Sequence, residues 1–327
     1  MTEILKVFEE PLTSAQSFIS ALEEVPRWVL NNEWSSPWIF RGQKDSTWWL
    51  TPAAWRVNAS VQIQRLGQVR QKFIVEYTPV IQEELERTQL VQADLTNVVK
   101  SYAQARAEYE LIYDFVKLAD ELGHSVPNMH FYRFPSGYNC IAQLRSFPLL
   151  HFLPQPNSAT ALAQHHGIPT RLLDWTKNPL YAAYFAANDV NPTDADGSIA
   201  VWAIQIDLLR STGANNQHNA PSGYARFLDH TVPNSENRYL HSQNGLFLNP
   251  VYGCAHCAIK GEFPNLEEFA LQIERELSKP IIKKLTLPYS EVGELLRLLW
   301  LKGVSRAQLM PTLDNITQAL CSRWQWI

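Results

Sequence analysis

The chain has few cysteines, no long hydrophobic run and little excess charge, and each absence narrows what it can be. Four cysteines in 327 residues are too few for a disulfide scaffold. No stretch approaches the roughly 18 uninterrupted apolar residues that a membrane span needs. The start, MTEILKVFEE, lacks the basic and apolar regions of a secretory signal. We therefore expect a cytoplasmic protein without membrane association.

Two nucleotide-binding signatures are also missing. The sequence has neither the GxGxxG of a Rossmann fold nor the GxxxxGK[ST] of a P-loop. The formal net charge of −4 supplies no general attraction for nucleic acid. Hydrophobic residues, in contrast, make up 46% of the chain, which is enough for a packed core. Eleven tryptophans are many, and most are expected in that core.

Strand-like and helix-like segments alternate without a strict βαβ rhythm. The fold class that this predicts is α+β, with a mixed or antiparallel central sheet flanked by helices. Strands are expected at 38–43, 47–52, 197–207, 245–249 and 280–288. Helices are expected at 13–33, 140–145, 158–167, 178–189, 265–278, 290–302 and 312–322, with an ordered turn at 168–176 and a polar loop at 211–237.

Residues 60–123 look helical almost throughout, with breaks expected near Pro79 and near Asp94 and an end at Gly123. We interpret this stretch as an inserted helical subdomain or lid that could recruit a protein partner. The core would then comprise residues 1–59 and 124–327.

The first segment with chemical potential is WIFRGQ, residues 38–43, with a further arginine at Arg56. An arginine on a strand offers a fixed fork for phosphate or carboxylate. The adjacent Gly42 would let a ligand approach the backbone closely. The alternative is structural: an internal salt bridge of Arg41 and a bulge at Gly42.

The second segment is AQHHGIPTRLLDWTKNPLYAAYFA, residues 163–186. Its polar side chains lie between two apolar helices, so most of them need partners. We expect Arg171 to pair with Asp174, or Asp174 to pair instead with Arg41 across a site. The free N–H groups at the start of the helix near Asn178 could hold an anion. The alternative is a buried polar network that fixes a tight turn.

Two weaker signals complete the set. In RYLHSQNGLF, residues 238–247, Arg238 and Gln243 precede a glycine that would permit close backbone approach, although a surface loop is the favoured interpretation. Cys254, His256 and Cys257 supply three possible metal ligands, but no second ligand pair has zinc-site spacing, so no metal is predicted.

Taken together, these segments resemble the FRG domain family, named for the Phe-Arg-Gly found here at 40–42. The resemblance rests on FRGQ, on LAQHHGIPTRLLDWTKNPLYAAYFA, on R-x-x-x-x-Q-x-G-x-F at 238–247 and on KKLTLP, and it spans about 37–322. The order of these segments is also similar to arginine-type ADP-ribosyltransferases, which place an aromatic-Arg-Gly on a first core strand and a Glu-bearing segment last.

That second likeness implies NAD as the ligand and substrate. Arg41 would bind the dinucleotide phosphates, Thr170 or Thr176 would orient the ribose, and Trp175 or Tyr184 would stack on a ring. Gln243 stands where the catalytic glutamate is expected, and a neutral amide cannot supply its charge. Asp174, Glu236 or Glu262 are the candidate replacements. The remaining residues of the expected nucleotide site are Gly42, Gln43 and Arg171.

The sequence thus predicts a nucleotide-binding protein that transfers ADP-ribose or hydrolyses NAD, as a toxin or defence effector would. The residues expected to act are Arg41, His166, Asp174 and Gln243. One alternative is a non-catalytic binding module that uses the same pocket. Another is nucleic-acid binding through Arg41, Arg56, Arg65 and Arg70, which the net charge disfavours.

Overall fold

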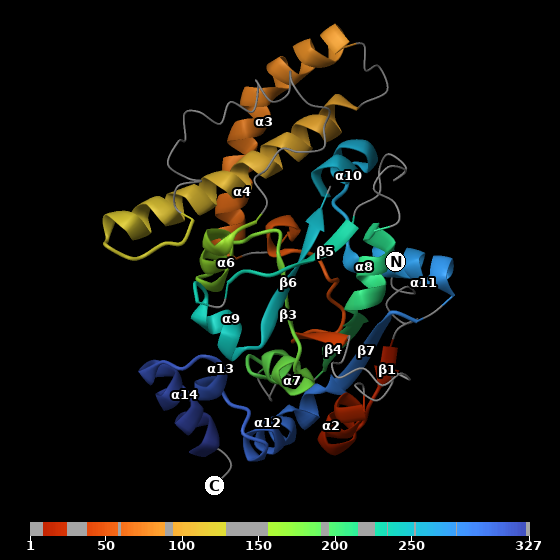
Figure 1. Cartoon of the computed structure of the whole chain (residues 1–327), viewed down its shortest axis with the longest axis vertical. Helices are drawn as coiled ribbons and strands as arrows, with labels where there is room; N and C mark the ends of the chain where they lie inside the picture. The colour runs from red at the N-terminus through yellow and green to blue at the C-terminus, as the bar shows by residue number, and fades with distance from the viewer. Residues whose placement is uncertain are drawn as a thin grey trace.

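A computed structural model gives the fold of the chain (Figure 1). The residues it describes are 9–24, 38–57, 60–88, 94–128, 156–190, 196–214, 226–233, 235–251, 253–278 and 280–324. The short helix expected at 140–145 lies outside them.

Within these residues the chain forms a seven-stranded sheet in the order β1-β7-β4-β2-β3-β6-β5. The strands are β1 (Glu9–Pro11), β2 (Trp38–Gln43), β3 (Leu173–Thr176), β4 (Ser198–Gln205), β5 (Arg226–His230), β6 (Gly245–Val251) and β7 (Ile282–Pro288). The β1–β7 pair is parallel and the other pairs are antiparallel. The predicted α+β class with a mixed, mainly antiparallel sheet is confirmed.

Helices cover both faces of the sheet because its strands are apolar on both sides. On β2, Trp38 and Phe40 enter one core while Ile39 enters the other, as the alternation of a strand requires. The first core packs under α2 (Ala15–Glu24), α7 (Pro179–Ala187) and α12 (Val292–Leu301). The second packs under α8 (Ile206–Ala214) and α11 (Leu266–Leu277).

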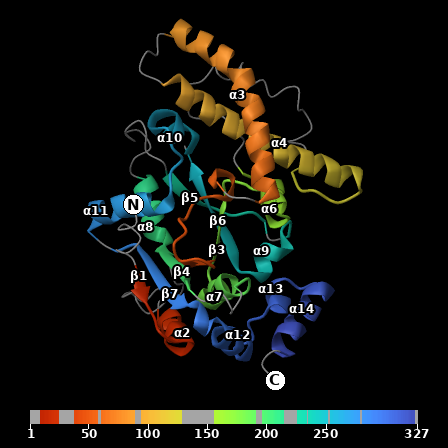
Figure 2. The same ribbon diagram turned by 180° about the vertical axis from the view of Figure 1, so that it is seen from behind.

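Two long helices extend from this body in both views of the molecule (Figures 1 and 2). They are α3 (Val61–Thr88) and α4 (Leu95–Glu121), which form a third core with Trp55 and with α10 (Gly253–Lys260). The break expected at Pro79 is wrong, because α3 continues through it. Tyr77 and Ile81 are buried on either side of the proline, and this packing offsets the hydrogen bond that the proline cannot donate.

Three further predictions need correction. Residues 47–50 form no strand, because the main chain there bonds to side chains: Gln43 donates to the Trp49 carbonyl, and the Leu50 N–H donates to Glu267. The chain then enters a short 3-10 helix, η2 (Ala53–Trp55). The turn expected at 168–176 contains β3, and the loop expected at 211–237 contains β5.

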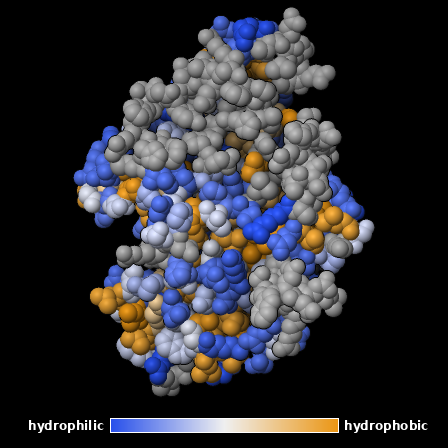
Figure 3. All heavy atoms as spheres, in the orientation of Figure 1, coloured by the Kyte–Doolittle hydropathy of each residue, from blue (hydrophilic) through white to orange (hydrophobic). Residues whose placement is uncertain are grey.

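Helix ends follow the sequence signals closely. Asn265 caps α11 through Glu268 N–H, and Pro179 occupies the first turn of α7. Gly167, with φ of +90°, follows the last residues of α6 (Ser158–His165). The described chain also contains η4 (Tyr289–Glu291), α9 (Arg238–Ser242), α13 (Arg306–Leu309) and α14 (Leu313–Trp324). Leu313 and Ile316 of α14 are exposed, and Figure 3 shows hydrophobic side chains at the surface in this part of the molecule.

No helix in the described part of the chain has both the length and the apolar character needed to cross a membrane.

Candidate functional site

The site begins where two neighbouring strands separate. β2 and β3 are paired at a single position, Phe40 opposite Thr176. Beyond that pair, Arg41 spans the gap between them, donating from Nη1 to the main-chain carbonyl of Asp174 at 2.7 Å. The same nitrogen lies 3.7 Å from the Asp174 carboxylate. Burial lowers the pKa of Arg41, and the charge of Asp174 opposes that effect.

A cavity of about 320 Å³ opens at this gap. Its lining combines two arginines and a carboxylate with an aliphatic wall. The lining residues are Arg41, Ala53, Arg56, Ser60, Gln62, Ile63, Gln164, Gly167, Ile168, Pro169, Leu172 and Asp174. They come from β2, η2 and its flanks, the start of α3, the end of α6 and the segment leading into β3. The start of the helical region at 60–123 therefore contributes to the wall of the site.

The two arginines give the cavity an excess of positive charge. Arg56 donates from Nε to the Thr51 carbonyl at 2.7 Å. Burial, together with the positive charge of Arg41, lowers the pKa of Arg56 to about 10. Arg41 Nε is buried and has no hydrogen-bond partner among the described residues. Two guanidinium groups thus lie near a single carboxylate, and an anionic ligand would neutralise the remaining positive charge.

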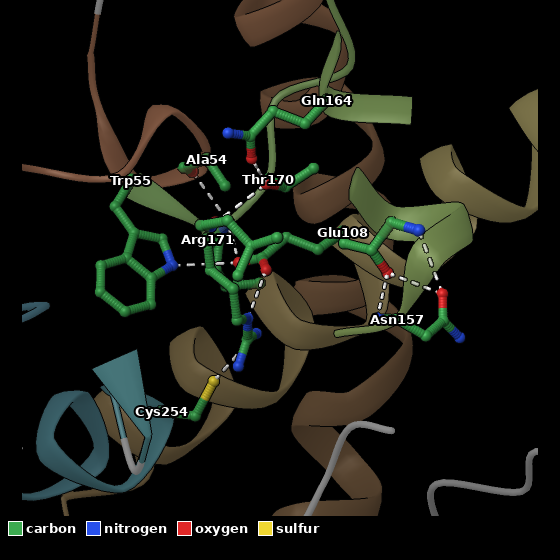
Figure 4. Close-up of polar contacts among 11 residues, drawn as sticks. Ala54, Trp55, Glu108, Asn157, Gln164, Thr170, Arg171 and Cys254 are labelled. Atoms are coloured by element: carbon green, nitrogen blue, oxygen red, sulfur yellow. Dashed lines mark hydrogen bonds and ion pairs between the residues drawn. The ribbon is translucent and has the colours of Figure 1, made fainter. Parts of the chain in front are cut away.

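The Asp174 side chain is 64% exposed, and neighbouring polar side chains hold its carboxylate in place. Gln164 donates from Nε2 to Asp174 Oδ1 at 2.6 Å. Thr170 in turn donates its hydroxyl hydrogen to Gln164 Oε1, a contact that Figure 4 also draws. Of the two pairings that the sequence left open for Asp174, the structure has the one with Arg41.

The glycine and the glutamine of FRGQ have structural positions. A Cβ on Gly42 would lie 2.0 Å from the Ala182 carbonyl oxygen and 2.6 Å from Ala186 N. The backbone that approaches Gly42 is therefore α7, and not a ligand as the sequence suggested. Gln43 is buried, accepts from Trp202 Nε1 and donates to the Trp49 carbonyl. Neither residue lines the cavity.

Arg171 belongs to a different network (Figure 4). Its Nε donates to Glu108 Oε2 on α4 at 2.7 Å, so the expected pairing with Asp174 is wrong. Glu108 Oε1 also accepts from Trp55 Nε1 and Gln104 Nε2. Burial acts to lower the pKa of Arg171, but the charge of Glu108 outweighs it and the net shift is upward. This network ties α4 to the body of the protein.

The other expected site residues lie away from the cavity lining. Trp175 is 3% exposed in the core under α11, and Tyr184 is 6% exposed in the opposite core. Thr176 donates to the main-chain carbonyl of Gln243 at 2.7 Å, near the far end of β3. His166 is the C-cap of α6, and its ring stacks on Phe115. Burial raises the pKa of Tyr184 to about 12.

The sequence alone does not reveal the positions of Gln164 and Arg56 in the site. Gln164 lies in the polar segment that the sequence singled out, but its orienting role depends on Thr170 and Asp174, which the turn into β3 brings to it. Arg56 follows FRGQ in the sequence, yet its place in the cavity depends on η2, which no sequence signal predicts. Ala54 N–H in η2 donates to the Thr170 carbonyl at 3.0 Å and fixes that position.

The cysteine-rich tetrapeptide at 254–257 lies within α10. Cys254 and Cys257 are buried, and burial raises the pKa of both thiols. Across the residues that the structure describes, no three His, Cys, Asp or Glu side chains gather as metal ligands would.

Comparison with known proteins gives one finding. The model of the FRG domain family matches residues 137–195, and the described part of that match holds Gln164, Thr170, Arg171 and Asp174. No curated protein and no solved structure matches the chain, so the likeness to ADP-ribosyltransferases gains no support. The match covers the polar segment on which the site is built, and the chain is an FRG domain-containing protein.

Proposed function

We propose that this FRG domain-containing protein binds a nucleotide through its phosphate in the cavity beside Arg41. The observation that carries the proposal is the charge imbalance of the lining. Arg41 and Arg56 line the cavity together with one exposed carboxylate, Asp174. Arginine forks of this kind bind phosphate oxygens by paired hydrogen bonds.

The size and walls of the cavity define what else the ligand can place there. Its volume of about 320 Å³ lies at the small end of ligand pockets, enough for part of a nucleotide. The apolar wall is aliphatic, formed by Ile63, Ile168, Pro169 and Leu172. A base would pack on this wall, since Trp175 and Tyr184 lie in the cores.

Isothermal titration with AMP, ADP and NAD tests the proposal. We expect binding that weakens at least about tenfold in Arg41→Ala, because charge-assisted bonds are each worth about 1.5–3 kcal/mol. Binding should also weaken as salt is raised. Arg65→Ala, an exposed arginine on α3, is the matched control and should bind as the wild type does. Equal affinity in Arg41→Ala and wild type would exclude the site.

A second candidate function is cleavage of NAD at the nicotinamide–ribose bond, and the position of Asp174 favours it. A carboxylate beside the phosphate-binding arginine could stabilise positive charge that develops on the ribose. Gln243 would then have no part in the chemistry. Nicotinamide would leave with the bonding electron pair, and water or an acceptor group would add to the ribose carbon and release a proton.

Nicotinamide release separates the functions. An enzyme gives turnover that is lost in Asp174→Asn while NAD still binds. Tight binding without turnover identifies a non-catalytic module. Binding of labelled RNA or DNA that depends on Arg65 and Arg70 as much as on Arg41 would favour the nucleic-acid alternative.

A further inference from the structure

We propose that the cavity selects a phosphorylated ribose with free hydroxyl groups, and that Asp174 is the residue that recognises those hydroxyls. This inference rests on the proposed phosphate binding and adds the sugar to it. Its basis is a chain of hydrogen bonds, Thr170 to Gln164 to Asp174, whose direction is fixed at every step.

The direction is set at Asp174, since an ionised carboxylate can only accept hydrogen bonds, and it is matched at the other end of the chain by Thr170. Its Oγ1 accepts a hydrogen from Leu172 N–H at 3.1 Å. A hydroxyl has one hydrogen, and that of Thr170 goes to Gln164 Oε1. The carbonyl end of Gln164 therefore faces Thr170, and its amide hydrogens face Asp174 Oδ1 at 2.6 Å. The amide of Gln164 is thereby held in one orientation.

The consequence falls on Asp174. One of its oxygens accepts from Gln164, and the other lies 3.7 Å from Arg41 Nη1, beyond hydrogen-bond distance. An ionised carboxylate only accepts hydrogen bonds, and it has more acceptor sites than these contacts use. With 64% of the side chain exposed at the cavity, Asp174 is open to hydroxyl donors of a ligand.

The adjacent charges fix which ligands can use this acceptor. A bare phosphate or a carboxylic acid anion would satisfy Arg41 and Arg56 but would be repelled by Asp174. A ligand that carries its negative charge next to hydroxyl groups satisfies both. Phosphorylated ribose has that arrangement, and the aliphatic wall of Ile63, Ile168, Pro169 and Leu172 leaves room for an uncharged substituent on the sugar.

Calorimetric titration of the full chain with four probes tests the inference: inorganic phosphate, ribose 5-phosphate, AMP and 2′,3′-dideoxy-AMP. We expect AMP to bind about tenfold or more tightly than the dideoxy compound, since a hydrogen bond to a charged group is lost. Ribose 5-phosphate against AMP shows whether the base adds affinity. In Asp174→Asn the preference for AMP over dideoxy-AMP should disappear, while inorganic phosphate binds as well or better because a repelling charge is gone.

Asp120→Asn, at the exposed end of α4, removes the same charge elsewhere and should leave every affinity unchanged. Equal binding of AMP and dideoxy-AMP, with both dependent on Arg41, overturns the ribose inference and leaves phosphate binding intact. No binding of any probe overturns the proposed function and the inference with it. If Asp174→Asn fails to fold, the comparison of the two AMP compounds on the wild type still decides.

Discussion

Two arginine–carboxylate pairs involve the polar segment at 163–186, Arg171 with Glu108 and Arg41 with Asp174, and they differ in how far they are shielded from solvent. Arg171 and Glu108 are 13% and 3% exposed, and Glu108 accepts hydrogen bonds from three side chains. Arg41 is similarly shielded at 14%, but its partner Asp174 is 64% exposed. The Arg171–Glu108 pair is bonded internally and to buried neighbours, whereas the Arg41–Asp174 pair keeps hydrogen-bonding groups that a ligand can use.

Within one polar segment, this difference distinguishes a pair that stabilises the fold from a pair that is available to a ligand. A buried pair with full partners holds two parts of a fold together, and removing one member leaves a charge without compensation. An open pair contributes little to stability and leaves its groups available to a ligand. Arg171 and Asp174 are three residues apart, yet they belong to different pairs.

The largest expected effect comes from breaking the closed pair. Glu108→Ala leaves the Arg171 guanidinium buried and also strands Trp55 Nε1, so the free energy of unfolding should fall by about 3–5 kcal/mol. Asp174→Ala is the matched change in the open pair and should cost less than about 1 kcal/mol. Urea unfolding followed by circular dichroism measures both. Equal losses in the two variants would contradict the distinction drawn between the pairs.

Glu267 shows how burial acts on the pKa of a carboxyl group that, unlike Glu108, forms no ion pair in the described part of the chain. Glu267 is fully buried, and its Oε2 has no partner in the described part of the chain. Burial raises the pKa of Glu267 to about 7, against the lowering effect of Leu50 N–H. In the window between the usual carboxyl range and pH 7, the folded state holds a proton that the unfolded state has lost.

Stability from this group is therefore complete at acid pH and is lost as pH rises towards and through 7. One unit of pKa difference corresponds to about 1.4 kcal/mol, so the loss amounts to a few kcal/mol. Glu267→Gln should remove this slope, which unfolding measured from pH 5 to 8 would reveal. Parallel pH profiles for the variant and the wild type would show that Glu267 is not the titrating group.

Substitutions at the adjacent residues Arg41 and Gly42 should differ in their effects, one on ligand binding and the other on stability. Gly42→Ala places a methyl group against the Ala182 carbonyl, and we expect a loss of about 1–3 kcal/mol or more from the displacement of α7. Arg41→Ala should leave thermal unfolding nearly unchanged while ligand binding is lost. If Gly42→Ala melts like the wild type, the contact between α7 and β2 is looser than the structure indicates.

The smallest effect is expected from removing the hydrogen bond through which Thr170 orients Gln164, and thereby Asp174. Thr170→Val removes the hydrogen that orients Gln164, at a cost in stability of about 1 kcal/mol. The amide of Gln164 then keeps only its bond to Asp174, and the preference for AMP over dideoxy-AMP should fall a few-fold without a change in phosphate affinity. Thr176→Val, which removes a buried hydroxyl that bonds to the Gln243 carbonyl and not to Gln164, is the control.

Much of the fold could be predicted from the sequence because local signals specify it. Glycines after helices, Asn265 as a cap and the apolar runs of β4 and β7 set their elements correctly. β5, which lies in a polar region, and the continuity of α3 through Pro79 depend on packing partners distant in sequence. Periodicity within a segment carries no information about such partners.

Only part of the candidate site could be predicted, because the sequence does not show which distant residues become partners. Arg41 and Asp174 stand out as polar residues in apolar surroundings, and one expected pairing joins them. The partner of Arg171 is Glu108, 63 residues away on α4, and nothing in the composition of α4 distinguishes that glutamate from its other acidic residues. Conversely, Trp175 and Tyr184 resemble ligand-stacking aromatics in sequence but fill the two cores.

The contact between Gly42 and α7 determines where the site can move. With no side chain between them, helix and strand touch through their backbones, so this side of the molecule offers no slack for sliding or rotation. The opposite side of the cavity is made of side chains, among them Ser60, just before α3, and Gln62 and Ile63 in the first turn of that helix. Any adjustment to a ligand must therefore be taken up there, and a long helix tilted at its base would carry a small displacement outward to its far end.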